Sequence, residues 1–216
     1  MPLYTLVVSE IEVVYMLLFS QTATFKNQFF TRTTMASTSE EEFSYELRVP
    51  RERVAVLIGK KGETKRLIER ETKTELEVDS EDGIVEIKGK DALLLYLARE
   101  IIRAIGRGFN PDVALQLLKQ DYAFELITLN DYARNPNDYE RLRGRVIGEG
   151  GKSRRTIEEL TGISICVFGK TAGIIGPADY ISDARRAIES LLSGSPHAHV
   201  YKWLEKRRKE RRRTEI

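Results

Sequence analysis

Residues 56–65 read Val56-Leu57-Ile58-Gly59-Lys60-Lys61-Gly62-Glu63-Thr64-Lys65, and the same frame returns 89 residues further along the chain. There it reads Val146-Ile147-Gly148-Glu149-Gly150-Gly151-Lys152-Ser153-Arg154, and the two copies align without a gap. One Gly-x-x-Gly is a weak signal in a chain with 15 glycines, but a repeated frame with hydroxyl and basic residues at matching positions is a strong one. The chain is therefore predicted to contain two copies of one structural unit.

Hydrophobic patterning predicts the same order of elements around both copies. In the first copy we expect a strand at 45–49, a helix at 51–58, a second helix between Gly62 and Thr72, strands at 76–78 and 84–87, and a closing helix whose apolar face carries Leu94, Leu97, Ile101 and Ile105. In the second copy we expect a strand at 124–129, helices at 139–147 and 153–160, strands at 163–168 and 173–175, and a closing helix at 181–192. This order, with a loop inserted at 130–138, is typical of an α+β fold.

The repeat also predicts the domain boundaries. We expect an N-terminal arm at 1–42, a first domain at 43–108, a linker with a short helix at 109–120, a second domain at 121–194, and a basic C-terminal helix or tail at 195–216. The apolar stretch Leu3–Phe19 contains Ser9, Glu10 and Glu12 and has no basic flank, so we expect neither a membrane span nor a signal peptide there. The arm is interpreted as a strand or a disordered segment; alternatively, translation begins at Met35.

Composition narrows the partners of the two domains. The net charge is only +2, so any affinity for nucleic acid must come from the local distribution of charge. The windows 51–66 and 140–155 each hold six Lys or Arg against two Glu, and each surrounds a glycine loop. The single cysteine, Cys166, excludes an internal disulfide and is too little for a zinc or iron–sulfur site, which is typical of a reducing cytoplasm. Cys166 is interpreted as a small core residue.

The predicted order of strand, helix, Gly-x-x-Gly, helix, strand, strand and helix resembles a type I KH domain. The resemblance implies two tandem type I KH domains, each with a three-stranded antiparallel sheet packed on helices, followed by a C-terminal helix. In KH domains the glycine loop clamps the backbone of about four unpaired nucleotides. The residues suit this role, because glycines let a phosphate approach the main chain and the following helix offers free N–H groups and the positive end of its dipole.

The candidate RNA-binding residues are the two glycine loops and their basic neighbours. In the first domain they are Gly59, Lys60, Lys61, Gly62, Lys65 and Arg66. In the second domain they are Arg143, Arg145, Gly148, Glu149, Gly150, Gly151, Lys152, Arg154 and Arg155. The bases are expected on an apolar shelf drawn from Val54, Leu57, Leu76 and Val78, or from Val146, Ile163 and Ile165, although several of these residues must belong to the core instead.

The two loops differ in charge. The second loop has Glu149 and Gly150 where the first has Lys60 and Lys61, so a carboxylate stands where a phosphate is expected. This carboxylate favours weaker binding, or binding of a differently placed strand, whereas the flanking arginines offer bidentate phosphate contacts that lysine lacks. We expect both loops to contact RNA, and their relative contribution stays open.

Two longer stretches narrow the resemblance. Residues Asn137–Lys152 and Gly194–Glu205 are similar to the archaeal form of the partner-of-Nob family, whose members are small-subunit ribosome assembly factors. The resemblance implies a protein that binds near the 3′ end of small-subunit ribosomal RNA together with the endonuclease Nob. We also expect a cytoplasmic monomer, with other assembly or translation factors as further partners. Eukaryotic relatives are degenerate in the first glycine loop, whereas this chain retains Gly59 and Gly62. Their division into one RNA-binding and one protein-binding domain is therefore not transferred to this chain.

The remaining motifs favour binding over catalysis. The stretch Lys202–Arg213 holds eight basic and two acidic residues, and we interpret it as a helix with a frayed end that reaches a phosphate backbone, or as a disordered nonspecific arm. No enzyme is expected, because Val146 replaces the first glycine of a phosphate loop and a helix precedes the motif. No cofactor is implied, and His197 and His199 are too few for a metal site. A general RNA chaperone or messenger-RNA regulator, and a scaffold in which one KH domain binds protein, remain as alternatives.

Overall fold

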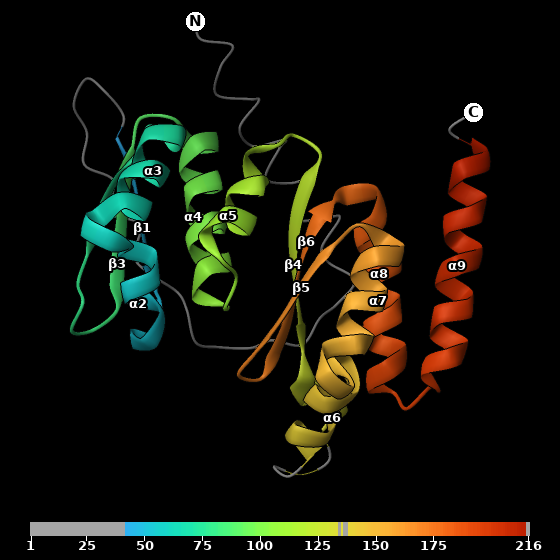
Figure 1. Ribbon diagram of the computed structural model, residues 1–216. Helices are drawn as coiled ribbons and strands as arrows, with labels where there is room; N and C mark the ends of the chain where they lie inside the picture. The colour runs from blue at the N-terminus through green and yellow to red at the C-terminus, as the bar shows by residue number, and fades with distance from the viewer. Residues whose placement is uncertain (1–41, 134, 136–137, 215–216) are drawn as a thin grey trace, which may run out of the picture. The chain divides into compact units, whose positions relative to one another are not determined.

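The structure is a computed structural model, and it describes residues 42–133, 135 and 138–214 (Figure 1). The predicted arm, with its apolar stretch and the alternative start at Met35, lies outside the described residues up to residue 41. The described chain contains two three-stranded antiparallel sheets, the helices packed on them, and a long C-terminal helix. The predicted α+β fold with two tandem units is confirmed.

The two units repeat one order of elements. The first unit runs β1 (Phe43–Arg48), α2 (Arg51–Ile58), a 3-10 turn (Lys60–Gly62), α3 (Glu63–Thr72), β2 (Glu75–Val78), β3 (Ile84–Gly89) and α4 (Ala92–Gly106). After α5 (Pro111–Ala114) and a 3-10 turn (Leu115–Leu118), the second unit runs β4 (Tyr122–Thr128), a 3-10 turn (Leu129–Tyr132), α6 (Asp138–Ile147), a 3-10 turn (Glu149–Gly151), α7 (Lys152–Thr161), β5 (Ser164–Phe168), β6 (Thr171–Pro177) and α8 (Ala178–Leu192). The strand orders are β1-β3-β2 and β4-β6-β5, so β2 and β5 are equivalent edge strands.

Local chemistry determines where these helices begin and end. α4 begins after Asp91, whose carboxylate accepts hydrogen bonds from the N–H groups of Leu93 at 2.8 Å and Leu94 at 3.1 Å. α7 ends at Gly162, which adopts the left-handed conformation with a φ of 73°. Because caps and glycines act within a few residues, these boundaries can be read from the sequence.

The buried face of α4 differs from the predicted one. Ile101 and Ile105 are buried as predicted, whereas Leu94 and Leu97 are only half-buried. The other buried residues of this helix are Leu95, Ala98, Glu100, Ile102, Ala104 and Gly106. The reason is that α4 packs against β1 and β3 on one side and against α5 on another, so its second half is enclosed almost all round. Helical periodicity identifies one apolar face and cannot show a second covering layer.

The stretch between the two units is packed rather than extended. It contains a short helix near the predicted position, and Phe109, Ala114 and Leu117 are buried there. These residues share one hydrophobic cluster with the first unit and with Ile175 of β6 in the second. The predicted linker therefore joins the two units through a common core and is not a spacer.

Cys166 lies at the same junction. It is half-buried on β5 and packs against the hydrophobic cluster of the first unit. A Cβ on Gly108, just after α4, would lie 2.8 Å from the Sγ atom of Cys166 and 3.0 Å from the Cβ atom of Phe168, so the chains approach closely here. Burial raises the pKa of the Cys166 thiol. Cys166 is packed, as predicted, but it packs against the first unit rather than within the core of its own unit.

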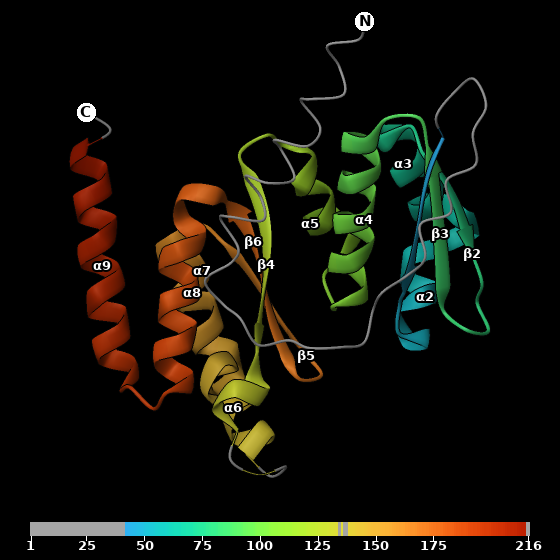
Figure 2. The same cartoon turned by 180° about the vertical axis from the view of Figure 1, so that it is seen from behind.

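The basic tail is helical. α9 (His197–Thr214) packs against α7 and α8 (Figure 1, Figure 2). This outcome confirms the predicted C-terminal helix over the disordered arm for the part of the tail that the structure describes. None of the described helices is long and apolar enough to cross a membrane.

Candidate nucleic-acid interface

Both glycine loops adopt the same backbone conformation. The first residue has a φ of 72° and a ψ of 178° at Gly59, and a φ of 74° and a ψ of 172° at Gly148. The third residue is left-handed, with a φ of 53° at Lys61 and 54° at Gly150. The fourth residue is also left-handed, with a φ of 77° in the first loop and 79° in the second. The repeated sequence thus encodes one loop geometry twice.

The first glycine of each loop is required because of its conformation and because of its surroundings. A positive φ is unfavourable for residues with a side chain. A Cβ on Gly59 would lie 2.3 Å from the Oγ1 atom of Thr64, and a Cβ on Gly148 would lie 2.6 Å from the main-chain N of Ser153. The hydroxyl residue that matches between the two copies therefore packs directly against the glycine, which leaves no room for another residue.

The middle positions of the loops differ in strain as well as in charge. Lys60 and Lys61 in the first loop and Glu149 and Gly150 in the second are all exposed. Lys61 holds a left-handed conformation, which costs a residue with a Cβ roughly 1–2 kcal/mol. Gly150 adopts the same conformation without that cost. The first loop thus retains a strained lysine where the second loop has a relaxed glycine.

The helices that follow the loops begin without a side-chain cap. The N-cap residues of α3 and α7 are Gly62 and Gly151, and no side chain caps the first turn of either helix. The N–H groups of Glu63 and Lys152, the first residues of these helices, donate to the carbonyl O atoms of Lys60 and Glu149. The N–H groups that follow in the first turn have no cap from the glycine and carry the positive end of the helix dipole. An anionic group such as a phosphate binds favourably at this position.

The cations of the first loop have two different roles. Arg66 folds back onto the loop, where its Nη2 donates to the carbonyl O of Lys61 at 2.6 Å and its Nε donates to the next carbonyl at 3.2 Å. Lys65 forms an ion pair with Glu69, with 3.7 Å between Nζ and Oε1. Lys60 and Lys61 form no ion pair with any acid in the described part of the chain. These two lysines are thus available to a ligand, while Arg66 braces the loop.

Arg145 serves the fold rather than a ligand. Its Nε donates to the carbonyl O of Leu191 at 2.7 Å, and its Nη2 donates to the carbonyl O of Ser195 at 2.7 Å. These bonds tie the last turn of α6 to the end of α8. The partners lie 46 and 50 residues away in the sequence, so charge patterning near the loop could not reveal them.

Buried polar atoms without a hydrogen bond occur on both helices that flank the second loop. Three buried side-chain atoms lack a hydrogen bond within the described residues, and they are the Nε of Arg143, the Nε of Arg154 and the Oγ of Ser153. Lys152 and Arg155, on the first turn of α7, are exposed. Buried polar groups nearly always have a partner, so these three atoms indicate a place that a water, an ion or a ligand completes.

A glutamate braces each loop-bearing helix to the neighbouring edge strand. The Oε1 of Glu69 on α3 accepts from the N–H of Leu76 on β2 at 3.0 Å, and the Oε1 of Glu158 on α7 accepts from the N–H of Ile165 on β5 at 2.8 Å. Each carboxylate also faces a cation one turn earlier on its own helix, at 3.7 Å. The brace sets the spacing between helix and edge strand. Its two glutamates coincide in the repeat, which is the signal that could have identified them.

The apolar shelf is smaller than predicted. Val54, Leu57, Leu76, Val146, Ile163 and Ile165 are each at most 4% exposed, so these six candidates belong to the core and not to the shelf. These side chains lie between sheet and helices, where both layers cover them. Val78 is half-buried, and so is Ile58 at the end of α2. Their equivalents Ile147 and Val167 in the second unit are half-buried too, which leaves two matching apolar pairs beside the loops.

Known proteins share this arrangement. Residues 123–209 match the family model of the eukaryotic type KH-domain (KH-domain type I), and residues 44–104 match that of the KH domain. The KH domain-containing protein MJ0443 of Methanocaldococcus jannaschii is 49% identical over 171 residues, which cover 77% of this chain and 75% of that protein. RNA-binding protein PNO1 of Oryzias latipes is 36% identical over 123 residues, which cover 54% of this chain and 51% of that protein.

A solved structure extends the likeness to three dimensions. A chain in the crystal structure of an a/eIF2alpha-aDim2p-rRNA complex from Pyrococcus horikoshii is 45% identical, with a TM-score of 0.74. The match covers 78% of this chain and 96% of that one. Each copy of the repeat matches a KH model, and two archaeal proteins are 49% and 45% identical over 77% and 78% of this chain. This chain therefore belongs to the PNO1 family of KH-domain proteins, in its archaeal form.

Proposed function

We propose that this protein binds single-stranded RNA through its two glycine loops and acts as an assembly factor near the 3′ end of small-subunit ribosomal RNA. The observation that carries the proposal is the group of three buried polar atoms without a hydrogen bond beside the second loop, of which the Nε of Arg154 has only a 3.7 Å ion pair with Glu158. They call for a polar ligand where an uncapped helix meets exposed cations. A relative crystallised in a complex with rRNA supports RNA as that ligand.

The geometry suggests how a strand is held. A phosphate at the start of α7 accepts hydrogen bonds from the first-turn N–H groups, while Lys152 and Arg155 supply countercharge from the exposed side. The adjoining bases lie over the half-buried pair Ile147 and Val167. Glu149 repels a phosphate that approaches close to its carboxylate. The strand therefore passes on the side of the loop that carries Lys152 and Arg155. The backbone grip is independent of base identity, as is general for phosphate contacts.

The first loop holds a strand in the same way. There the N–H groups of α3 and the exposed Lys60 and Lys61 receive the phosphate, and Ile58 and Val78 form the apolar surface. The proposal further includes the Nob endonuclease as a protein partner, a monomeric state and a cytoplasmic location, all of which rest on the family resemblance. It involves neither catalysis nor a cofactor.

Replacing the middle residues of either loop by two aspartates is expected to weaken RNA binding about 10- to 100-fold, because hydrogen bonds to charged groups contribute about 1.5–3 kcal/mol. The variants are Lys60→Asp with Lys61→Asp, and Glu149→Asp with Gly150→Asp. Titration of a labelled single-stranded RNA at fixed salt measures the affinity. Unchanged affinity in both variants would defeat the proposal.

Crosslinking followed by sequencing separates the proposed function from its alternatives. Reads concentrated at one site near the 3′ end of the small-subunit RNA support an assembly factor. Reads dispersed over many RNAs support a general chaperone or messenger-RNA regulator. An absence of reads in protein that still binds its partners supports a scaffold.

Lys61→Gly is expected to raise the free energy of unfolding by about 0.5–1 kcal/mol. Relief of the left-handed strain, roughly 1–2 kcal/mol, outweighs the added entropy of the unfolded chain, about 0.4–1 kcal/mol. The same change removes a cation, so RNA binding is expected to weaken. Urea unfolding and RNA titration measure the two effects. A variant that binds RNA as tightly as wild type would show that the strained lysine has no role in binding.

A further inference from the structure

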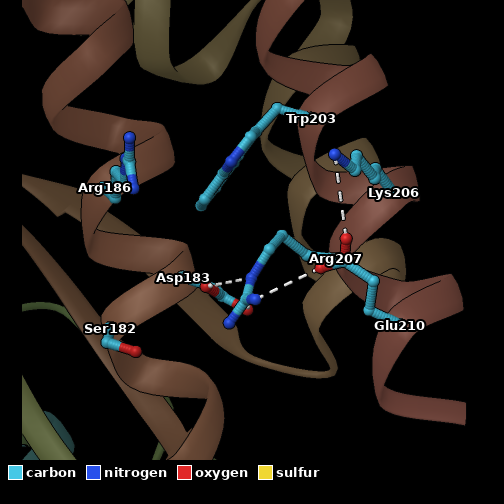
Figure 3. Close-up of a pocket in the computed structure, with 7 residues that line it drawn as sticks. All are labelled: Ser182, Asp183, Arg186, Trp203, Lys206, Arg207 and Glu210. Atoms are coloured by element: carbon cyan, nitrogen blue, oxygen red, sulfur yellow. Dashed lines mark hydrogen bonds and ion pairs between the residues drawn. The ribbon is translucent and has the colours of Figure 1, made fainter. Parts of the chain in front are cut away.

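α9 has an inner line of residues that fixes its orientation. Val200 and Leu204 are buried in the core of the second unit. Arg207 and Arg211 continue that line, and both pair with Asp183 of α8, which is only 5% exposed; the Nε of Arg207 lies 3.1 Å from Oδ1 (Figure 3). The hydrogen bond with Asp183 raises the pKa of Arg207. Apolar burial and a charged anchor together determine which side of α9 faces solvent.

A shallow hollow lies between α8 and α9 beside this anchor. Its volume is about 470 Å³, and it is lined by Ser182, Asp183, Arg186, Trp203, Lys206, Arg207 and Glu210 (Figure 3). The guanidinium carbon of Arg186 lies 5.0 Å from the centroid of the Trp203 ring. Trp203 is the single tryptophan of the chain, so its fluorescence reports on the docking of α9.

The solvent-facing surface of α9 carries four exposed cations, Lys202, Lys206, Lys209 and Arg213, which we call the α9 stripe; Lys206 also lines the hollow. Their spacing of four, three and four residues places them on one side of the helix, over roughly 16 Å of its length. Within the described chain, only Lys206 of these four has an acidic partner, Glu210 at 3.8 Å, and such an exposed pair contributes little. Like charges one turn apart repel, so the stripe lowers helix stability.

α9 begins beside the last turn of α6, the helix that leads into the second glycine loop. The Nε2 of His197, at the first residue of α9, lies 2.9 Å from the carbonyl O of Arg145, three residues before Gly148. At the other end, the Nη2 of Arg211 lies 3.4 Å from the carbonyl O of Leu160 in the last turn of α7. α9 therefore runs beside α7, from the level of the last turn of α6 to the far end of α7. Lys202, the first cation of the α9 stripe, follows His197 by five residues, about 7.5 Å along the helix axis.

We propose that the α9 stripe binds phosphates of the RNA that flanks the segment held by the second glycine loop. This inference rests on the proposed function and extends the RNA contact of the second unit beyond the roughly four nucleotides that one loop clamps. A polyanion is the ligand that relieves the repulsion within the stripe, and the neighbouring loop is built to hold one. The contribution is independent of base sequence and decreases as salt increases.

The test compares single-stranded RNAs of about 5 and about 15 nucleotides. It uses the full chain with Lys60→Asp and Lys61→Asp, so that a long RNA gains nothing from the first loop. In the stripe variant Lys202, Lys206, Lys209 and Arg213 are replaced by glutamine. If about three phosphate contacts are lost, the slope of log affinity against log salt for the longer RNA decreases by about 2, and its affinity at low salt decreases about tenfold or more. The short RNA binds within about twofold of the parent.

A control variant with the same change in net charge replaces Arg48, Arg51, Arg70 and Lys73, which are exposed in the first unit, by glutamine. It is expected to bind the longer RNA like the parent, and an unchanged Trp203 emission in the stripe variant confirms that α9 stays docked. The proposal is overturned if the stripe variant matches the parent, as it would if α9 faced a protein partner, or if the control variant loses as much affinity. Failure of the proposed function appears separately, as unchanged binding of the short RNA by the aspartate loop variants.

Discussion

Phe109→Ala is expected to lower the free energy of unfolding by about 3–5 kcal/mol, the usual cost of truncating a buried phenylalanine. Phe109 is 3% exposed, and its ring meets that of Phe124 with 5.9 Å between centroids and an interplanar angle of 88°. A Cβ on Gly173 of β6 would lie 2.6 Å from the Cε2 of Phe109, so the ring lies directly over the main chain of the second sheet. Its loss leaves a cavity between the two units.

Urea unfolding followed by two probes measures this effect. Trp203 fluorescence reports the second unit, whereas far-ultraviolet circular dichroism reports both. Coincident transitions indicate one cooperative unit, and we expect Phe109→Ala to separate them. Phe43→Ala is the matched control, because that ring is 41% exposed, and we expect it to cost less than about 1 kcal/mol. If Phe109→Ala unfolds like the wild type, the two units are not coupled through this residue.

Gly148→Ala is expected to lower the free energy of unfolding by about 2–5 kcal/mol and to weaken RNA binding more than tenfold. The positive φ contributes roughly 1–2 kcal/mol, and overpacking contributes about 1–3 kcal/mol. The new Cβ would lie 2.6 Å from the main-chain N and from the Cβ of Ser153, so α7 must move. That movement displaces the N–H groups that are proposed to receive a phosphate.

Gly150→Ala separates the energetic cost of the left-handed conformation from the cost of a close contact with neighbouring atoms. Gly150 has a φ of 54°, but nothing lies within 4 Å of a Cβ placed there, so only the cost of the left-handed conformation is expected, roughly 1–2 kcal/mol. Thermal or urea unfolding and RNA titration of both variants provide the comparison. Equal destabilisation by the two alanines would refute an energetic role for the close contact between Gly148 and Ser153.

Most of the element order followed from local signals in the sequence. Proline before α2, a capping aspartate before α4 and glycine after α7 each act on residues a few positions away, and apolar periodicity distinguished helices from strands. The duplication strengthened the prediction, because each copy supported the other. Local signals did not predict the buried face of α4, because that face depends on contacts with α5 as well as with its own sheet.

The candidate site also combines features that the sequence predicted with features that it did not. The glycine loops and the exposed Lys60 and Lys61 lie as the repeat indicated. Arg145 was a candidate for RNA binding, but it donates to the carbonyl groups of Leu191 and Ser195 instead. The packing of α8 beside α6 brings these partners to it. The core residues assigned to the apolar shelf failed for a related reason, since a strand pattern does not show which of its faces a helix covers.

The sequence by itself determined the two loops, because a positive φ and the absence of room for a Cβ can be met only by glycine, and that requirement is written at the residue concerned. Only the tertiary structure decided which cations are available to a ligand, that Phe109 joins the two units, and that α9 begins beside the helix that leads into the second loop. These outcomes depend on contacts between elements far apart in the chain. Hydrogen-bond partners and covering layers are set by that packing, and a local pattern carries no information about them.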